Sequence, residues 1–201
     1  MLDRAARRLV DPALERLAIA AQQRSLTANQ VTIAGFACGV AAIGAIALQA
    51  YPLGLLLLLA NRLADGIDGA LARRVGATDL GGYLDIVLDF IIYSGCAFAF
   101  AVAQPEHALP AAFLIFSFMG TGSSFLAFAI FAAKRKLDGE TAAANKSFYY
   151  LGGITEGTET ILLFVIILLF PGWFPITAYL YGTLCWLTTV GRIGAAVQRL
   201  R

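Results

Sequence analysis

Four aspartates stand in two close pairs within a largely apolar stretch, residues 62–90. Asp65 and Asp68 are three positions apart, and Asp85 and Asp89 are four apart. In helices, each pair would therefore lie on one helical face. A charged side chain inside a membrane helix costs about 2.5–3.5 kcal/mol on insertion scales. Four carboxylates in such a stretch predict a functional site.

Carboxylates cannot all remain ionised at close quarters in a low dielectric unless cations accompany them. No histidine or cysteine stands between these four residues, so the ligand set is all oxygen. Oxygen ligands select hard ions such as magnesium or manganese, and two ions bridged by carboxylates suit phosphoryl chemistry. The four aspartates therefore predict a site for two divalent ions.

Apolar helices must position these aspartates, because the 201-residue chain is 59% hydrophobic and only 14% charged. We expect an all-α membrane protein with six transmembrane helices, at about residues 27–49, 52–73, 82–104, 110–133, 147–170 and 175–197. Residues 27–201 would form the catalytic domain. Residues 1–26 would form an amphipathic helix at the cytoplasmic membrane surface, with Asp11 as its cap before Pro12 and Leu17 on its apolar stripe.

Lysines and arginines all fall at one set of helix ends in this arrangement, with Arg62, Arg73 and Arg74 assigned to the inner end of the second span. The opposite turns, around residues 51–52, 105–107 and 171–175, contain none. The positive-inside rule then places both termini and the aspartates in the cytoplasm. We expect a multi-pass protein of a bacterial inner (cytoplasmic) membrane.

Small residues surround the aspartates and would let a bulky anionic ligand approach the backbone. They are Gly66, Gly69, Ala70 and Ala72 before the turn, and Gly76, Gly81 and Gly82 after it. Arg73 could then meet a phosphate. The alternative is that these residues only let two helices pack, with the acids paired to Arg62, Arg73 and Arg74.

The motif D-x-x-D-G-x-x-A-R, followed by G-x-x-x-D-x-x-x-D, has every fixed position filled, by Asp65, Asp68, Gly69, Ala72, Arg73, Gly81, Asp85 and Asp89. It resembles the signature of the CDP-alcohol phosphatidyltransferase family. The six-span layout extends this resemblance to nearly the whole chain. Thr27, Asn29 and Thr32 resemble the family's nucleotide-side entry more weakly.

The resemblance implies that a CDP-linked lipid such as CDP-diacylglycerol donates its phosphatidyl group to a small alcohol and releases CMP, in phospholipid biosynthesis. It implies two Mg²⁺ or Mn²⁺ ions on the four aspartates, with Asp89 also the general base. The CDP end would be bound by Gly69, Ala72, Arg73, Asn29 and Gly81.

The acceptor pocket is predicted where the third, fourth and fifth spans meet. Glu156 and Glu159 would share one face of the fifth span, at the depth of Ser123 and Ser124 in the fourth. Acids there favour a polyol or an amino alcohol, whereas a phosphorylated acceptor would favour a basic group. The basic candidates, expected near the surface, are the cluster Lys134, Arg135, Lys136 and Lys146, or Arg192. Alternatively, the glutamates only bond to serines and threonines of the fourth span.

Two other functions are consistent with intramembrane acids: a divalent-cation transporter and a non-catalytic membrane assembly protein. A transporter would need polar residues through to the outer face, and the outer halves of the second and third spans are nearly all apolar. An assembly protein would tolerate loss of an acid, and none is lost. Expected partners are the CDP-linked donor, an alcohol and membrane lipids, with no nucleic acid. Gly120 and Gly122 would permit a homodimer.

Overall fold

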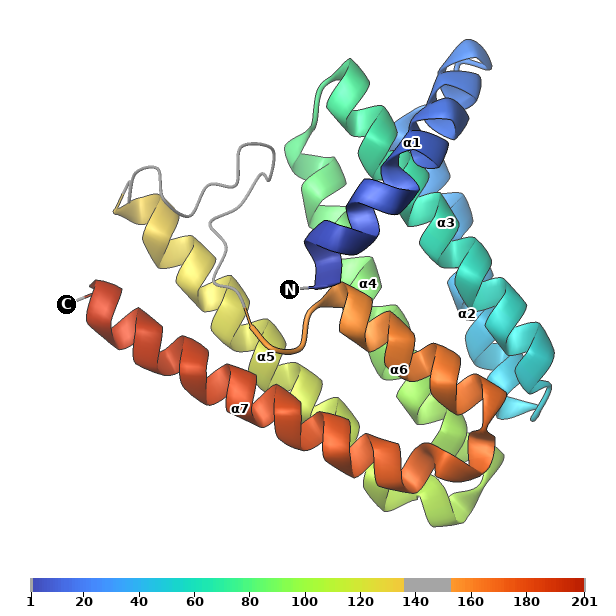
Figure 1. Ribbon diagram of the computed structural model, residues 1–201, viewed down its shortest axis with the longest axis vertical. Helices are drawn as coiled ribbons and strands as arrows, with labels where there is room; N and C mark the ends of the chain where they lie inside the picture. Colours follow the sequence, from blue (N-terminus) through green and yellow to red (C-terminus); the bar gives the residue numbers. More distant parts are fainter. Residues whose placement is uncertain (1, 136–152, 201) are drawn as a thin grey trace.

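The structure, a computed structural model, describes residues 2–135 and 153–200 (Figure 1). Every regular element among these residues is a helix. The all-α prediction is confirmed. In chain order the elements are α1 (Leu2–Gln23), α2 (Ala28–Ala47), α3 (Tyr51–Val75), α4 (Asp79–Ala103), the 3₁₀ turn η1 (Pro105–His107), α5 (Ala108–Lys134), α6 (Gly157–Leu169), the 3₁₀ turn η2 (Pro171–Trp173) and α7 (Phe174–Leu200).

Local signals fix the helix ends nearest the aspartates. Thr27 opens α2 with a reciprocal capping box, in which its hydroxyl accepts from the Gln30 N–H at 3.3 Å and its own N–H donates to Gln30 Oε1 at 2.9 Å. Gly76 ends α3 with a φ of 103°, which a residue with a Cβ rarely adopts. Thr78 then caps α4 by accepting from the Gly81 N–H at 3.0 Å. This turn of three residues, 76–78, joins the two helices that carry the aspartate pairs.

Helix α2 packs against both α3 and α4 and so bridges the two helices that carry the aspartates, while α5 lies beside α7 and α6 contacts α3 (Figure 1). The α2–α3 approach is close at Gly35, where a Cβ would lie only 2.6 Å from the Ala64 Cβ. A hydrophobic core that includes Phe100, Phe164 and Phe174 joins the helices toward the other end. The framework around the aspartates is thus built from tightly packed helices.

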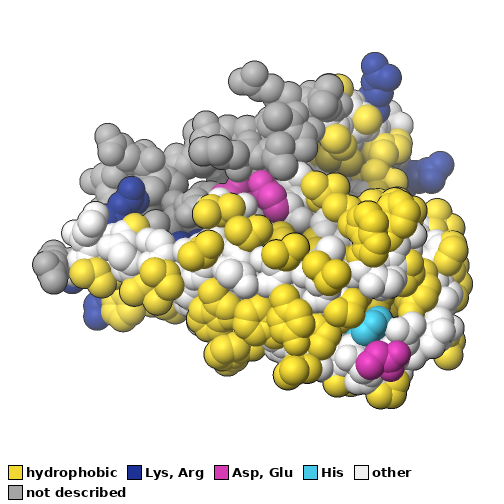
Figure 2. Space-filling model, turned by 60° about the horizontal axis from the view of Figure 1, so that its bottom comes forward, with side chains coloured by type: hydrophobic (Ala, Val, Ile, Leu, Met, Phe, Trp, Pro, Cys, Tyr) yellow, Lys and Arg dark blue, Asp and Glu magenta, His cyan; other side chains and the backbone are white. Residues whose placement is uncertain are grey.

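Three of the described helical segments are long and apolar enough to cross a membrane: Ala28–Ala47, Asp79–Ala103 and Pro105–Lys134. Apolar side chains dominate the face shown in Figure 2, and large ones such as Met119 and Leu180 are exposed. Such a surface is typical of a protein covered by lipid. These features support the membrane class, whereas six spans and an interfacial α1 stay predictions.

The predicted start of the first helix at Asp11 and Pro12 is wrong, because α1 begins at Leu2 and includes Pro12. Proline removes one backbone donor, and this helix continues through that loss. Among the described side chains of α1, Leu14 and Ala18 are buried and pack against Ala70 and Leu71 of α3. Leu17, in contrast, is exposed. The division into residues 1–26 and 27–201 stays a prediction.

The fifth span is predicted to be helical from residue 147, but the described part of this segment is not helical at its start. Residues 153–156 are not helical, and α6 begins only at Gly157. The hydroxyl oxygen of Thr188, on α7, accepts from the N–H groups of Ile154 and Thr155 at 3.2 and 3.3 Å. Gly153 permits this contact, since a Cβ there would lie 2.3 Å from Thr188 Cγ2. At Ile154 and Thr155, hydrogen bonds to α7 therefore take the place of bonds within a helix.

Candidate metal centre

A pocket between α2, α3 and α4 brings all four predicted aspartates together. The two pairs come from neighbouring helices, Asp65 and Asp68 from α3 and Asp85 and Asp89 from α4, and α2 closes one side. The pocket is lined by these four aspartates and by Thr32, Gly35, Phe36, Asn61, Arg62 and Leu88. The sequence prediction that both pairs face one site is consistent with this arrangement.

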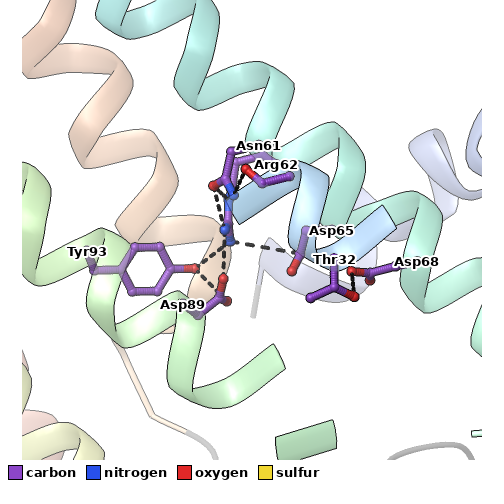
Figure 3. Close-up of polar contacts among 8 residues, drawn as sticks. Thr32, Asn61, Arg62, Asp65, Asp68, Asp89 and Tyr93 are labelled. Atoms are coloured by element: carbon purple, nitrogen blue, oxygen red, sulfur yellow. Dashed lines mark hydrogen bonds and ion pairs between the residues drawn. The ribbon is translucent and has the colours of Figure 1, made fainter. Parts of the chain in front are cut away.

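Three of the four carboxylates form the centre of the pocket. One oxygen each from Asp65, Asp85 and Asp89 lie within 4.8 Å of one another. Asp68 is turned toward α2, where Thr32 Oγ1 lies 2.5 Å from its Oδ2 (Figure 3). The four predicted ligands thus divide into a cluster of three and a fourth held at its side.

Arg62 supplies a positive charge next to this cluster. Its Nη2 lies 2.7 Å from Asp89 Oδ1, and its Nη1 lies 3.8 Å from Asp65 Oδ2 (Figure 3). The residue lies near the middle of α3, and its side chain is only 9% exposed. Its assignment to the inner end of the second span is therefore wrong. Arg74, at that end, pairs instead with Glu15 of α1 at 3.4 Å.

The cluster fits a hard divalent cation. Three carboxylate oxygens at mutual distances within 4.8 Å can converge on one small ion such as magnesium, whose oxygen–metal distance is about 2.0–2.1 Å. The Arg62 guanidinium carries one positive charge, whereas the three clustered carboxylates carry up to three negative charges. The donor set contains only oxygen, which disfavours zinc and copper. Geometry, charge and ligand chemistry therefore all agree with a magnesium or manganese site.

The residues predicted to bind the CDP end lie in two groups, toward the turn between α3 and α4. On α3, a Cβ built at Gly69 would meet nothing closer than Arg73 Nη1 at 3.6 Å. Helix packing within the described chain therefore does not require glycine at that position. Near the start of α4, a Cβ at Gly81 would lie 3.4 Å from Asn29 Oδ1 of α2. Ala72 is half-buried, one helical turn beyond Gly69.

The predicted acceptor residues have local roles in the structure. Glu156 is the cap of α6 rather than part of its face, and its N–H donates to Glu159 Oε2 at 3.2 Å. The hydroxyls of Ser123 and Ser124 donate to the carbonyls of Gly120 and Thr121 in their own helix. The prediction that Glu156 shares a helical face with Glu159 is wrong.

Two basic candidates have opposite environments. Lys134 is exposed at the end of α5, whereas Arg192 of α7 is buried. The Arg192 guanidinium donates to the Thr121 carbonyl at 3.0 Å and lies over the Phe125 ring. Lys136 and Lys146 lie outside the described residues. Arg192 therefore belongs to the interior, not near the surface.

Sequence reasoning missed one contributor to the site, Tyr93, and named Arg62 only in the alternative, as an ion-pair partner of the acids in helix packing. The Tyr93 hydroxyl donates to Asp89 Oδ2 at 3.1 Å. Both stand at helical spacing from an aspartate, Arg62 three residues before Asp65 and Tyr93 four residues after Asp89. An arginine inside a predicted span is itself a functional signal. It could have been recognised on that ground.

Comparison with known proteins gives one family. A family model described as CDP-alcohol phosphatidyltransferase matches residues 25–193. The chain is 50% identical over 202 residues to the inner membrane protein YnjF of Escherichia coli (strain K12), covering 100% of this chain and 98% of that protein. It is 30% identical over 189 residues to the archaetidylinositol phosphate synthase of Pyrococcus horikoshii, covering 93% and 92%.

Solved structures share the fold. The crystal structure of Mycobacterium tuberculosis phosphatidylinositol phosphate synthase (PgsA1) with CDP-DAG bound matches with a TM-score of 0.65 at 21% identity, over 91% of this chain and 92% of that chain. The same protein in complex with manganese and citrate matches with a TM-score of 0.65 at 20% identity, over 91% and 88%. At these identities the likeness concerns the fold alone.

Proposed function

The chain belongs to the CDP-alcohol phosphatidyltransferase family, and we propose that it transfers the phosphatidyl group of a CDP-linked lipid such as CDP-diacylglycerol to an alcohol, releasing CMP. It is thus a membrane transferase of phospholipid biosynthesis. This assignment displaces the two alternatives, a divalent-cation transporter and a non-catalytic assembly protein.

The observation that carries the proposal is the convergence of Asp65, Asp85 and Asp89 within 4.8 Å, with Asp68 in the same pocket. These four side chains would hold two Mg²⁺ or Mn²⁺ ions. Held by these carboxylates, divalent ions would supply positive charge to a pyrophosphate and to the attacking and leaving oxygens. The manganese complex of PgsA1 supports the choice of metal by analogy of fold.

Asp89 is the proposed general base. Its carboxylate is 27% exposed and lines the pocket, so an acceptor hydroxyl can reach it. The proton of that hydroxyl passes to Asp89 as the hydroxyl oxygen bonds to the lipid-side phosphorus. The bond from this phosphorus to the CMP oxygen breaks, and CMP leaves with the electron pair. One phosphorus–oxygen bond forms and one breaks, and the proton of the acceptor hydroxyl is bound by Asp89.

The CDP end would lie toward the α3–α4 turn, against Gly69, Ala72, Arg73, Asn29 and Gly81. The open space at Gly69 supports this placement, because a Cβ there would project toward ligand rather than toward a packed helix. Arg73 is exposed beside it and can pair with a phosphate oxygen.

For the acceptor, we favour a phosphorylated polyol. The names of two relatives, archaetidylinositol phosphate synthase and phosphatidylinositol phosphate synthase, describe products with a phosphorylated inositol. Arg192 lies beside Gly153, where a Cβ would be 3.2 Å from its Nη2. A guanidinium in a buried setting suits phosphate recognition. The glutamates Glu156 and Glu159 favour the alternative acceptors, a free polyol or an amino alcohol.

We further propose that the protein spans the bacterial inner membrane six times, with both termini and the aspartates on the cytoplasmic side. The name of YnjF, an inner membrane protein, supports this location. The spans would be α2, α3, α4, α5, the segment ending in α6, and α7. Helix α1 would lie at the cytoplasmic surface, where exposed Val10 and Leu17 can enter the lipid interface.

The direct test is CMP release by purified protein supplied with CDP-diacylglycerol, Mg²⁺ or Mn²⁺, and a panel of acceptors. The panel contains inositol phosphate, glycerol phosphate, free inositol, free glycerol and an amino alcohol. We expect release with a phosphorylated polyol, abolished by EDTA and restored by either metal. Asp89→Asn should abolish release. Asp79→Asn, an exposed aspartate in the first turn of α4, is the matched control and should retain it.

No release with any acceptor would contradict the proposed function, provided that the protein remains folded. Release with free polyols alone would contradict the acceptor assignment but leave the reaction class intact. Full activity of Asp89→Asn would exclude Asp89 as the base.

A further inference from the structure

Arg62 and Tyr93 stand outside the aspartate and glycine motif, yet both contact the proposed base. Arg62 Nη2 lies 2.7 Å from Asp89 Oδ1, and the Tyr93 hydroxyl donates to Asp89 Oδ2 at 3.1 Å (Figure 3). The two oxygens of one carboxylate are thus bound by two donors from two different helices. Such a pair of contacts leaves the carboxylate little rotational freedom.

The guanidinium is itself fixed by groups other than Asp89. Asn61 Oδ1 accepts from Arg62 Nε at 2.9 Å and from Nη2 at 2.7 Å. The Asn61 amide donates in turn to the Gly35 carbonyl of α2 at 3.0 Å, and Asn61 is buried. The packed α2–α3 pair therefore sets the position of the guanidinium. The Arg62 side chain has already lost its conformational entropy to these contacts, so its bond to Asp89 requires no further ordering.

The direction of the Tyr93 hydroxyl proton is fixed as well. Arg62 Nη1 donates to the Tyr93 oxygen at 3.0 Å, so the hydroxyl proton points to Asp89. The ring is stacked on Phe164 with 6.2 Å between centroids and is tilted against Phe118. Arg62, Tyr93 and Asp89 form a closed triangle, in which each member contacts the other two.

We propose that Arg62 and Tyr93 are positioning residues, which hold Asp89 so that its remaining lone pairs face the pocket and the acceptor hydroxyl. Asn61, on α3 and bonded to the Gly35 carbonyl of α2, supports the guanidinium. This inference rests on the proposed function, in which Asp89 is the base. It assigns to the triangle a role in the chemical step, beyond the joining of α3 to α4 that any buried ion pair would provide.

Tyr93→Phe is the sharpest test, because it keeps the stacked ring and removes only the hydroxyl. Its matched control is Tyr181→Phe, another buried tyrosine, whose hydroxyl lies 2.8 Å from Thr160 Oγ1 on α6. We expect kcat of Tyr93→Phe to fall about 10- to 100-fold, as loss of a hydrogen bond to a charged group allows. The KM for the CDP-linked donor should change less than about twofold. Tyr181→Phe should keep the wild-type kcat.

Arg62→Lys and Arg62→Met give a second, independent measurement. Lysine keeps the charge but cannot bridge Asn61, Tyr93 and Asp89 as a planar guanidinium does. We expect kcat to fall in the order wild type, Arg62→Lys, Arg62→Met. Because both residues act through Asp89, the kcat loss of the Arg62→Lys/Tyr93→Phe double variant should be smaller than the product of the two single losses.

Thermal unfolding of each variant in detergent separates stability from positioning. The inference is overturned if Tyr93→Phe unfolds at a lower temperature but keeps the wild-type kcat, if Arg62→Lys and Arg62→Met both keep it, or if the double variant is additive. Those results, with an active wild type and an inactive Asp89→Asn, would leave the proposed function intact. An active Asp89→Asn would instead refute the proposed base, and the positioning role with it.

Discussion

Thr32 of α2 and Asp68 of α3 are joined by a hydrogen bond of 2.5 Å between Oγ1 and Oδ2. The Thr32 hydroxyl has one proton and lies 3.0 Å from the Ala28 carbonyl as well, so the closer, charged acceptor is the stronger one. This contact turns Asp68 toward α2 and accounts for its place beside the cluster of three carboxylates. A third helix therefore takes part in a site whose motif lies entirely on two.

Thr32→Val should weaken metal binding without unfolding the protein. Valine keeps the shape and removes the donor that holds Asp68 at the pocket, at a cost of about 1.5–3 kcal/mol for a hydrogen bond to a charged group. We expect about a 10-fold higher Mn²⁺ concentration for half-saturation, measured by titration of the purified protein. Thr183→Val, which removes an exposed intrahelical bond to the Tyr179 carbonyl, is the control. Unchanged or tighter binding in Thr32→Val would refute this role.

Gly69→Ala and Gly35→Ala should have opposite effects. The space at Gly69 is open, so alanine there should keep the unfolding temperature and raise the KM for the CDP-linked donor, because the new methyl group occupies ligand space. A Cβ at Gly35 would lie 2.6 Å from the Ala64 Cβ, so alanine there should force α2 from α3 and lower the unfolding temperature. Thermal unfolding and donor KM, measured on both variants, check the pair. A normal KM in Gly69→Ala would argue against nucleotide binding at that position.

Leu14→Ala should release α1 from the helix bundle. Leu14 is buried against α3 above Gly66, and loss of a buried leucine costs about 2–5 kcal/mol. The measurement is the rate of trypsin cleavage after Arg16 and Arg24 in detergent, which should rise. Leu17→Ala, at a position that is 42% exposed, should leave the rate unchanged. If the bilayer alone held α1, neither variant would change cleavage in detergent.

The proposed topology predicts the outcome of reporter fusions. A fluorescent protein that folds only in the cytoplasm should fluoresce when fused after Arg201, because six spans return the chain to the side of the basic residues. Alkaline phosphatase fused after His107, in the turn between α4 and α5, should be active, since that turn would face the periplasm. Activity of the opposite reporters would reverse the assigned orientation.

The sequence by itself determined the all-α class, although not the starts of α1 and α6, and it predicted the two aspartate pairs that line the pocket. Helical periodicity sets which residues of one helix share a face, so the spacing of Asp65 with Asp68, and of Asp85 with Asp89, was enough to predict two facing pairs. The predicted spans end at residue 73 and begin again at 82, whereas in the structure Gly76 ends α3 and Thr78 caps α4. The family motif then supplied the reaction class, which the comparisons confirm.

Only the tertiary structure decided which groups from different helices meet. The Thr32–Asp68 and Arg62–Asp89 contacts depend on how helices rotate and cross, which no single helix encodes. Thr188 of α7 likewise binds the backbone before α6, so Glu156 became a cap although its local sequence suited a helix face. The physical reason is the same in each case. Periodicity is a property of one helix. A hydrogen bond between helices forms only where packing brings a donor atom of one helix within about 3 Å of an acceptor atom of the other.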